Sequence, residues 1–414
     1  MRRSKWLALL LALTLALAAC GGQPQNGGEM NAAPPQQEEQ SGNAGSQQEA
    51  EDESDESVEA SAPVEEVYTA ADMQDIDPYA PILSYWDVDF SKQPAFTSAA
   101  GLDAYFKDCV ENRCRNIVFS CSRDVRVELN SADFCDTYHL AWVNPKMQPG
   151  EFGKHYVISI TYYPGDNVAW AYLNNDKSML CEEELVLYDT AVAWLEENIS
   201  EDMTDYDKCV AIHDYISGSV KYSNELLAAL NTSYTFDWGI TAYGAMIDHL
   251  TICQGYADAF DMLTSMLGME CTQVAGSGGG ELHNWVLIQL DGSWYHVDCT
   301  WDATAFPGGD GTCSKAYLFV SDEQMRRTHS WEASLYPEAT DSSYWYYEKL
   351  GRKVSSQEEL EALVGEPLQN GQQADVYVEN LTQKQVTDYV QSLGGKFHTA
   401  EYQSGVVLCA WVEE

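Results

Sequence analysis

The chain has 414 residues and a formal net charge of −43, from 65 acidic and 22 basic residues. This excess of negative charge disfavours nucleic acid and anionic lipid surfaces as partners, because binding phosphate requires positive counter-charge. The length also exceeds what one hydrophobic core usually holds, so we expect more than one folded region.

The N-terminus has the order of an export signal. A basic cluster within the first five residues precedes an apolar run at 6–19, which is too short for a comfortable bilayer-spanning helix. The run ends in Leu-Ala-Ala before Cys20, and two glycines follow. These residues resemble the lipobox of bacterial lipoproteins, in which the cysteine is lipidated; the alternative is a signal peptide that happens to contain a cysteine. We expect 1–20 to be a lipoprotein signal peptide that anchors an exported protein, through Cys20, to the outer face of the membrane.

The next segment, residues 21–79, is polar and acidic. No Lys or Arg occurs in residues 21–77, and Gln, Glu, Ser, Asn and Ala dominate. Such a segment cannot bury enough apolar surface to offset its ordering entropy. We therefore predict a disordered acidic tether that holds the folded part away from the membrane.

Residues 80–180 are expected to form an N-terminal α+β domain. A helix is predicted at 101–112, and strands are predicted at 115–121 and 156–163, the last with alternating apolar residues and many β-formers. This region carries no chemical signature.

Residues 181–345 are expected to form the catalytic domain. Helices are predicted at 185–199 and 205–217, where apolar residues recur at helical spacing. His213 lies within the second helix, and we interpret it as a histidine that packs or hydrogen-bonds beneath the site rather than as a catalytic residue.

A further helix is predicted at 253–267, with Cys253 in its first turn. Thr251 can cap the start and Gly268 can end the helix. The helix dipole and the free N–H groups there favour a thiolate and can stabilise an oxyanion. Gly255 costs about 1 kcal/mol relative to alanine inside a helix, so we expect substrate or backbone to approach it closely. Taken alone, the cysteine is better explained as a buried structural thiol.

An Asp-Gly dipeptide at 291–292 lies between two β-rich runs that together span 283–301. This dipeptide predicts a hairpin with a two-residue turn, whose register places Trp285 opposite Asp298. His283 and Asp298 would then be diagonal neighbours on one face, with backbones roughly 7–8 Å apart. A carboxylate there can fix the tautomer of the imidazole and stabilise its charged form.

The combination of these features predicts a Cys–His–Asp site formed by Cys253, His283 and Asp298. A histidine and an aspartate on a hairpin are usually structural, but here they follow a helix-first-turn cysteine within one short stretch. His296 faces the same side and is the alternative base. The second oxyanion donor stays open, with Gln254 and Trp238 as candidates.

Several motifs accompany this site: AYGA at 242–245, CQGYA at 253–257, WYHVD at 294–298, TWD at 300–302, YLFVSD at 317–322 and HSW at 329–331. Their order and spacing resemble the transglutaminase-like domain of bacterial extracellular proteins, over about residues 206–331. The resemblance implies Cys253 as nucleophile, His283 as base and Asp298 as orienting residue. One departure is Asn284, where a small residue is expected, and it concerns only the local substrate contacts.

The expected fold class is therefore α+β: a papain-like transglutaminase core, in which the cysteine helix packs on an antiparallel sheet, between small α+β domains. The expected enzyme attacks an amide through a thioester acyl-enzyme. Hydrolysis of a peptide or isopeptide bond is favoured over Gln–Lys acyl transfer. Its partner would be a protein or peptide substrate, and the anchor favours a cell-wall-associated one. The alternative function is a non-catalytic, tethered binding or adhesion module.

Residues 350–414 are expected to form a small C-terminal α/β domain. We predict strands at 374–378 and 405–411 and a helix at 381–393 that ends before a glycine. The opening of this region weakly echoes the segment around 98–119, with a serine-led helix, a polar turn and a β-run.

The chain contains 12 cysteines. With Cys20 assigned to lipid and Cys253 to chemistry, ten remain, and their spacings show neither a disulfide framework nor the paired pattern of a zinc site. Disulfides and buried free thiols both stay open, because export permits the first and an oxygen-free habitat the second. We expect no metal and no cofactor.

Overall fold

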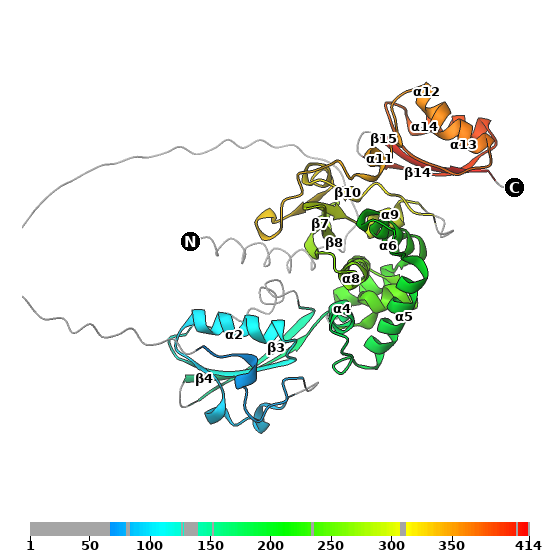
Figure 1. Cartoon of the computed structure of the whole chain (residues 1–414). Helices are drawn as coiled ribbons and strands as arrows, with labels where there is room; N and C mark the ends of the chain where they lie inside the picture. Colours follow the sequence, from blue (N-terminus) through cyan, green and yellow to red (C-terminus); the bar gives the residue numbers. More distant parts are fainter. Residues whose placement is uncertain are drawn as a thin grey trace, which may run out of the picture. The chain divides into compact units, whose positions relative to one another are not determined.

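Three β-sheets of four or five strands and one two-stranded pair organise the part of the chain that the structure describes (Figure 1). The structure is a computed structural model, which describes residues 67–79, 83–125, 127, 140–150, 153–232, 236–306, 312–402 and 405–412. The expected signal peptide, Cys20 and the expected tether up to residue 66 lie outside these residues. Among the described residues, no helix has the length and apolar character needed to cross a bilayer.

The first sheet has the strand order β1-β2-β4-β3. Its region contains η2 (Ala70–Asp72), η3 (Tyr85–Asp87), η4 (Phe90–Lys92), β1 (Ala95–Phe96), α2 (Ala99–Glu111), β2 (Asn116–Ser122), β3 (Trp142–Pro149) and β4 (Gly153–Thr161). The helix and both strands predicted here are confirmed, and Ser98 caps α2 through a bond from Gly101 N. Met73, near the end of the expected tether, is buried in this core, so the ordered chain begins earlier than composition alone predicts.

The central region places helices against a five-stranded antiparallel sheet of order β10-β9-β8-β7-β11. Its helices are α4 (Pro164–Asn174), α5 (Glu182–Asn198), α6 (Asp205–Ser219), α7 (Asn224–Thr232), η5 (Trp238–Ile240), η6 (Gly244–Asp248), α8 (Cys253–Met266), α9 (Cys299–Ala305), α10 (Asp322–Met325), η7 (Ala333–Leu335) and α11 (Tyr346–Lys349). Its strands are β5 (Lys221–Tyr222), β6 (Leu250–Thr251), β7 (Cys271–Gly278), β8 (Glu281–Leu290), β9 (Ser293–Val297), β10 (Leu318–Val320) and β11 (His329–Trp331).

The β8–β9 hairpin has the register that the sequence predicts. Leu290 pairs with Ser293 and Val286 pairs with Val297, and both turn residues have positive φ, 49° at Asp291 and 82° at Gly292. The second run does not continue as a strand to residue 301. It stops at Val297, because the next residue, Asp298, caps the start of α9 with its side chain.

The last sheet has the strand order β12-β13-β15-β14. Its region contains β12 (Lys353–Val354), α12 (Gln357–Leu360), η8 (Glu361–Gly365), α13 (Glu366–Gln369), β13 (Ala374–Glu379), α14 (Gln383–Ser392), β14 (Lys396–Tyr402) and β15 (Gly405–Trp411). The predicted strands and helix are confirmed here, and β14 is an additional strand.

The first and last sheets share one connectivity. In each, a two-residue strand pairs in parallel with the strand that follows the helix, and that strand pairs antiparallel with the last strand. The weak sequence echo therefore corresponds to a repeated supersecondary unit. Of the two sheets, the last contributes Tyr377 and Tyr402 to the central core, whereas the first has a core of its own.

Candidate active site

Cys253 is the first residue of α8, at the end of the helix where backbone N–H groups have no intrahelical partner. The preceding residue has extended backbone, and no side chain caps the helix. The prediction that Thr251 provides the cap is wrong, because its hydroxyl donates to the Gly239 carbonyl at 2.6 Å. A negative sulfur or oxyanion at this position therefore meets the positive end of the helix dipole.

Gly255 explains how closely the chain packs around this helix start. An added Cβ would lie 2.0 Å from Thr251 Oγ1 and 2.7 Å from the Thr241 carbonyl oxygen. The predicted close approach of neighbouring backbone is therefore confirmed. No other side chain can occupy this position without moving the β6–α8 connection.

The hairpin brings His283 and Asp298 together. His283 Nε2 lies 2.8 Å from Asp298 Oδ2, and the two residues are 7% and 0% exposed. Because Nε2 faces the carboxylate, Nδ1 is the ring nitrogen left for other contacts, and the imidazole also contacts the Cys253 side chain. The structure thus brings all three predicted residues into one site.

The charges of this pair stabilise one another. Burial by itself would lower the pKa of His283, but the Asp298 charge and hydrogen bond, together with contact to Cys253, raise it to about 10. Burial would likewise raise the pKa of Asp298, yet the His283 and His329 contacts hold it well below its ordinary value. The site therefore favours an imidazolium beside a carboxylate.

The second carboxylate oxygen of Asp298 is used to start a helix. Asp298 Oδ1 accepts hydrogen bonds from Thr300 N and Trp301 N, each at 3.0 Å, and so caps α9. This cap is the reason that β9 ends where it does. It also fixes the orientation of the carboxylate against the imidazole.

A histidine without a predicted role completes the surroundings of the carboxylate. His329 Nε2 lies 3.1 Å from Asp298 Oδ2, the same oxygen that faces His283. The sequence signal was the HSW motif at 329–331, but nothing in its spacing indicated a contact 31 residues away. The contact arises because β11 joins the sheet beside β7.

Two tryptophans enclose the pair of imidazoles. The Trp285 ring is stacked on His283 with centroids 5.9 Å apart, and the Trp301 ring lies 4.4 Å from that of His329. Such packing keeps water from the His283–Asp298 bond, and a lower local dielectric strengthens it.

His296 is not in a position to act as the alternative base. Its Nε2 lies 2.8 Å from Asp322 Oδ1, and its Nδ1 accepts the Trp285 indole N–H at 2.9 Å. It is fully buried, and burial lowers its pKa although Asp322 opposes that effect. The ring therefore supports Trp285, which in turn lies against His283.

His213 lies in a second polar cluster beneath the site. Its Nδ1 is 3.1 Å from Asp214 Oδ1 and its Nε2 is 3.1 Å from Asp302 Oδ2. Burial would lower the pKa of His213, but these carboxylates raise it well above its ordinary value. The interpretation of His213 as a hydrogen-bonded residue beneath the site is confirmed.

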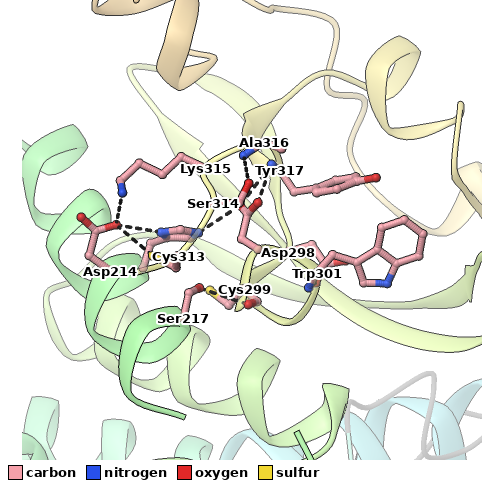
Figure 2. Close-up of polar contacts among 12 residues, drawn as sticks. Asp214, Ser217, Asp298, Cys299, Trp301, Cys313, Ser314, Lys315, Ala316 and Tyr317 are labelled. Carbon is pink, nitrogen blue, oxygen red and sulfur yellow. Dashed lines mark hydrogen bonds and ion pairs between the residues drawn. The ribbon is translucent and has the colours of Figure 1, made fainter. Parts of the chain in front are cut away.

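This cluster connects α6 to the segment that carries Asp298. Figure 2 shows Lys315 and Cys313 close to Asp214, at 3.2 Å and 3.8 Å from its Oδ1. Asp302 accepts the Tyr317 N–H, and the Tyr317 carbonyl in turn accepts Asp298 N at 3.2 Å. The buried network thus supports the backbone of Asp298.

Of the candidate oxyanion donors, Gln254 is already engaged through its side chain. Its Nε2 donates to Gln273 Oε1 at 2.7 Å, and its Oε1 accepts from Asn284 Nδ2. Trp238 lies in η5, next in sequence to Gly239, whose carbonyl accepts the Thr251 hydroxyl. The first-turn N–H groups of α8 are the donors that need no rearrangement.

Two groups of described residues have metal-ligand atoms within 4.8 Å of one another. One is His283, Asp298 and His329, whose short N–O distances are those of hydrogen bonds. The other is His213, Asp214 and Cys313. In this second group, the Asp214 carboxylate already forms an ion pair with the Lys315 ammonium.

Two cavities lie near the β5–β6 pair. One, of about 260 Å³, is lined by Tyr222 and Tyr256, and the Tyr222 hydroxyl lies within electrostatic range of Cys253. The other, of about 500 Å³, is lined by Leu226, Trp238 and Leu250 together with acidic residues.

All ten cysteines within the described residues carry free thiols. Of the possibilities left open by the sequence, free thiols are therefore the state that the structure holds. Cys20 and Cys135 lie outside the described residues.

Known proteins resemble the central region. Residues 193–299 match the family model of the transglutaminase-like superfamily. The human kyphoscoliosis peptidase is 26% identical over 201 residues, which cover 44% of this chain and 28% of that protein. The mouse protein of the same name is 33% identical over 91 residues, covering 19% of this chain and 13% of that protein. The chain thus spans less than a third of the length of these relatives.

Among solved structures, one titled as the crystal structure of a TGase aligns with 16% identity and a TM-score of 0.27, covering 60% of this chain and 67% of that one. Residues 193–299 thus resemble the transglutaminase-like superfamily, and the central region, with its cysteine helix packed on an antiparallel sheet, has an α+β fold. The predicted fold class is confirmed.

Proposed function

We propose that this protein is a surface-anchored cysteine enzyme that acts on amide bonds, with Cys253 as nucleophile, His283 as acid and base, and Asp298 as the residue that orients the imidazole. One observation carries the proposal: His283 turns Nε2 to Asp298 at 2.8 Å and keeps contact with a cysteine at a helix N-terminus. A nucleophile, a base in reach of it and a group that orients the base are the parts that acyl transfer requires.

The reaction proceeds in two steps. The Cys253 thiolate attacks the amide carbonyl, and the oxyanion meets the first-turn N–H groups of α8. The C–N bond breaks as the His283 imidazolium gives its proton to the departing amine, which leaves a thioester on Cys253. The neutral imidazole then takes a proton from water or from a second amine, whose attack releases the acyl group and restores the thiolate.

We favour a peptide or isopeptide bond as the substrate and water as the acceptor, with Gln–Lys acyl transfer as the alternative. The cavities beside β5 and β6, of about 260 Å³ and 500 Å³, offer room for the side chains of a peptide near the helix that begins with Cys253. A lipid anchor on Cys20 would hold the enzyme at the outer membrane face, where cell-wall-associated peptides and surface proteins are within reach.

An activated ester tests the proposal without a known substrate. With p-nitrophenyl acetate, we expect a burst of p-nitrophenol and an acetyl thioester on Cys253, detected by mass spectrometry. The burst should vanish in Cys253→Ala, and it should survive in Cys271→Ala, which removes a partly exposed thiol of the same domain. Failure of Cys253 to acylate would contradict the proposal and favour the tethered binding module. Adding cadaverine then shows which acceptor takes the acetyl group from Cys253. Formation of acetyl-cadaverine indicates transfer to an amine, and formation of acetate indicates hydrolysis.

Export and anchoring are tested separately. In a bacterial host with a lipoprotein pathway, we expect the full-length chain to take up labelled fatty acid and to fractionate with membranes. The Cys20→Ala variant should lose the label. Equal labelling of both proteins would contradict lipidation at Cys20.

A further inference from the structure

Asp298 carries two imidazoles on a single carboxylate oxygen. His283 Nε2 approaches Oδ2 at 2.8 Å, and His329 Nε2 approaches the same atom at 3.1 Å. The His283 ring also interacts with Cys253. The His329 ring is buried with its Nε2 on the carboxylate, so it can act on the site through Asp298.

A chain of hydroxyl groups leads to the other ring nitrogen of His329. The Tyr317 hydroxyl donates to Thr328 Oγ1 at 3.1 Å, and Thr328 Oγ1 lies 2.9 Å from His329 Nδ1. A threonine hydroxyl that accepts one proton has its own proton free to donate to Nδ1. Because an ionised carboxylate can only accept hydrogen bonds, His329 Nε2 carries the hydrogen that is directed at Asp298.

The sheet leaves space for both rings. β11 pairs with β7 so that His329 lies opposite Gly278. A Cβ on that glycine would come within 3.1 Å of His329 Nε2 and 3.1 Å of His283 Cδ2. The backbone thus fits closely around the two imidazoles and limits their movement.

We propose that His329 is a positioning residue of the active site: its Nε2–H holds the Asp298 carboxylate and, through it, the His283 ring in the orientation that serves Cys253. This role rests on the proposed function. Together with the bonds from Thr300 N and Trp301 N, it gives the carboxylate four donors, two on each oxygen. The four donors therefore share the negative charge of the Asp298 carboxylate, and His283 interacts with only part of it.

Loss of the His329 donor has a defined electrostatic consequence. A carboxylate with one donor fewer attracts the remaining imidazolium more strongly, so the pKa of His283 should rise further. An imidazolium held more tightly returns its proton to the leaving amine more slowly. The variant should therefore keep the thiolate–imidazolium pair up to a higher pH and yet acylate more slowly.

The test compares His329→Leu, His329→Gln and Thr328→Val in the full-length protein. Acylation by p-nitrophenyl acetate and alkylation of Cys253 by iodoacetamide are followed from about pH 5 to about pH 10, with His283→Ala as reference. For His329→Leu we expect acylation to fall by at least about 10-fold, because the ring loses its orientation, and the basic limb of the acylation profile to move to higher pH. His329→Gln supplies an N–H donor and should restore acylation to within about threefold of wild type.

Thr328→Val isolates the tautomer from the packing, because it keeps the ring and removes its hydroxyl partner. We expect acylation between those of wild type and His329→Leu. Wild-type profiles in His329→Leu, or equal impairment of the Gln and Leu variants in chains that melt like wild type, would overturn the positioning role. A wild-type Cys253 whose reactivity ignores His283 would instead overturn the proposed function, and this role with it.

Discussion

The central domain contains two buried histidines held by aspartates, with a cysteine near each, and they differ in one respect. His213 uses both ring nitrogens on carboxylates, at 3.1 Å each, whereas His283 uses only Nε2. A ring that donates from both nitrogens has no lone pair to accept a proton. The residue types are the same, and the free nitrogen decides which site can perform acid–base chemistry.

The cysteines near these two histidines, Cys253 and Cys313, also lie in different surroundings. Cys253 begins a 14-residue helix, where free N–H groups can stabilise negative charge, whereas Cys313 lies in a loop beside the Asp214 carboxylate. The comparison therefore favours Cys253 for the proposed chemistry and a supporting role for the cluster around His213.

The largest expected effect separates the two thiols. Cys253→Ala should reduce acylation by p-nitrophenyl acetate by at least about 10³-fold, because the nucleophile is lost. Cys313→Ala should stay within about threefold of wild type, since the sulfur is replaced at a buried loop position away from the reacting atoms. The burst amplitude measures both, and a comparable loss in the two variants would remove the distinction.

The next prediction compares substitutions of the two carboxylates, Asp298 and Asp214. Asp298→Asn should lower the acylation rate by about 10²- to 10⁴-fold, because an amide can donate to Nε2 and so favours the wrong tautomer of His283. Asp214→Asn, its counterpart at His213, should change the rate by less than about fivefold, since Asp302 still holds that ring. Single-turnover kinetics at neutral pH provide the comparison. Equal losses would mean that the two pairs act as one unit.

Substitutions in the cluster around His213 should instead lower the free energy of unfolding. His213→Gln removes an imidazolium from between two carboxylates and leaves the fully buried Asp302 without it, at a cost of roughly 3 kcal/mol in the free energy of unfolding. His283→Gln, at a site with one carboxylate partner, should cost less. Urea denaturation followed by tryptophan fluorescence measures both, and the opposite order would contradict the assignment.

The stability difference should also depend on pH. The pKa of His213 is raised in the folded state by Asp214 and Asp302 against the effect of burial, so its contribution is fully present below the unfolded value of about 6.5. It is lost as pH rises through the folded-state pKa. The gap in urea midpoint between wild type and His213→Gln should therefore narrow in alkaline solution, and a gap that widens there would show that the ring is not an imidazolium.

Local signals in the sequence predict much of this site. The Asp-Gly turn determines the β8–β9 register, and the register alone places Trp285 and Asp298 on one face. Gly268, with φ of 78°, marks the end of α8 as predicted. These features depend on neighbours within a few residues, which is the range over which sequence patterns carry information.

The features that sequence analysis missed depend on distant pairings. His329 reaches Asp298 only because β11 adds to the far side of β7, and His296 is occupied by Asp322 from α10. Thr251 fails as a cap because the Gly239 carbonyl, 12 residues earlier, competes for its hydroxyl. Each contact requires knowledge of the sheet order, which periodicity does not provide.

The central claim is that His283, oriented by Asp298, controls the charge of Cys253. The most direct measurement is the rate of alkylation of Cys253 by iodoacetamide, resolved by mass spectrometry against the other thiols, across pH in wild type and His283→Ala. We predict that wild-type Cys253 reacts well below pH 8, and that the ion pair persists until pH approaches the His283 pKa of about 10. The His283→Ala variant should lose this reactivity. A Cys253 that titrates like the remaining thiols in both proteins would contradict the account.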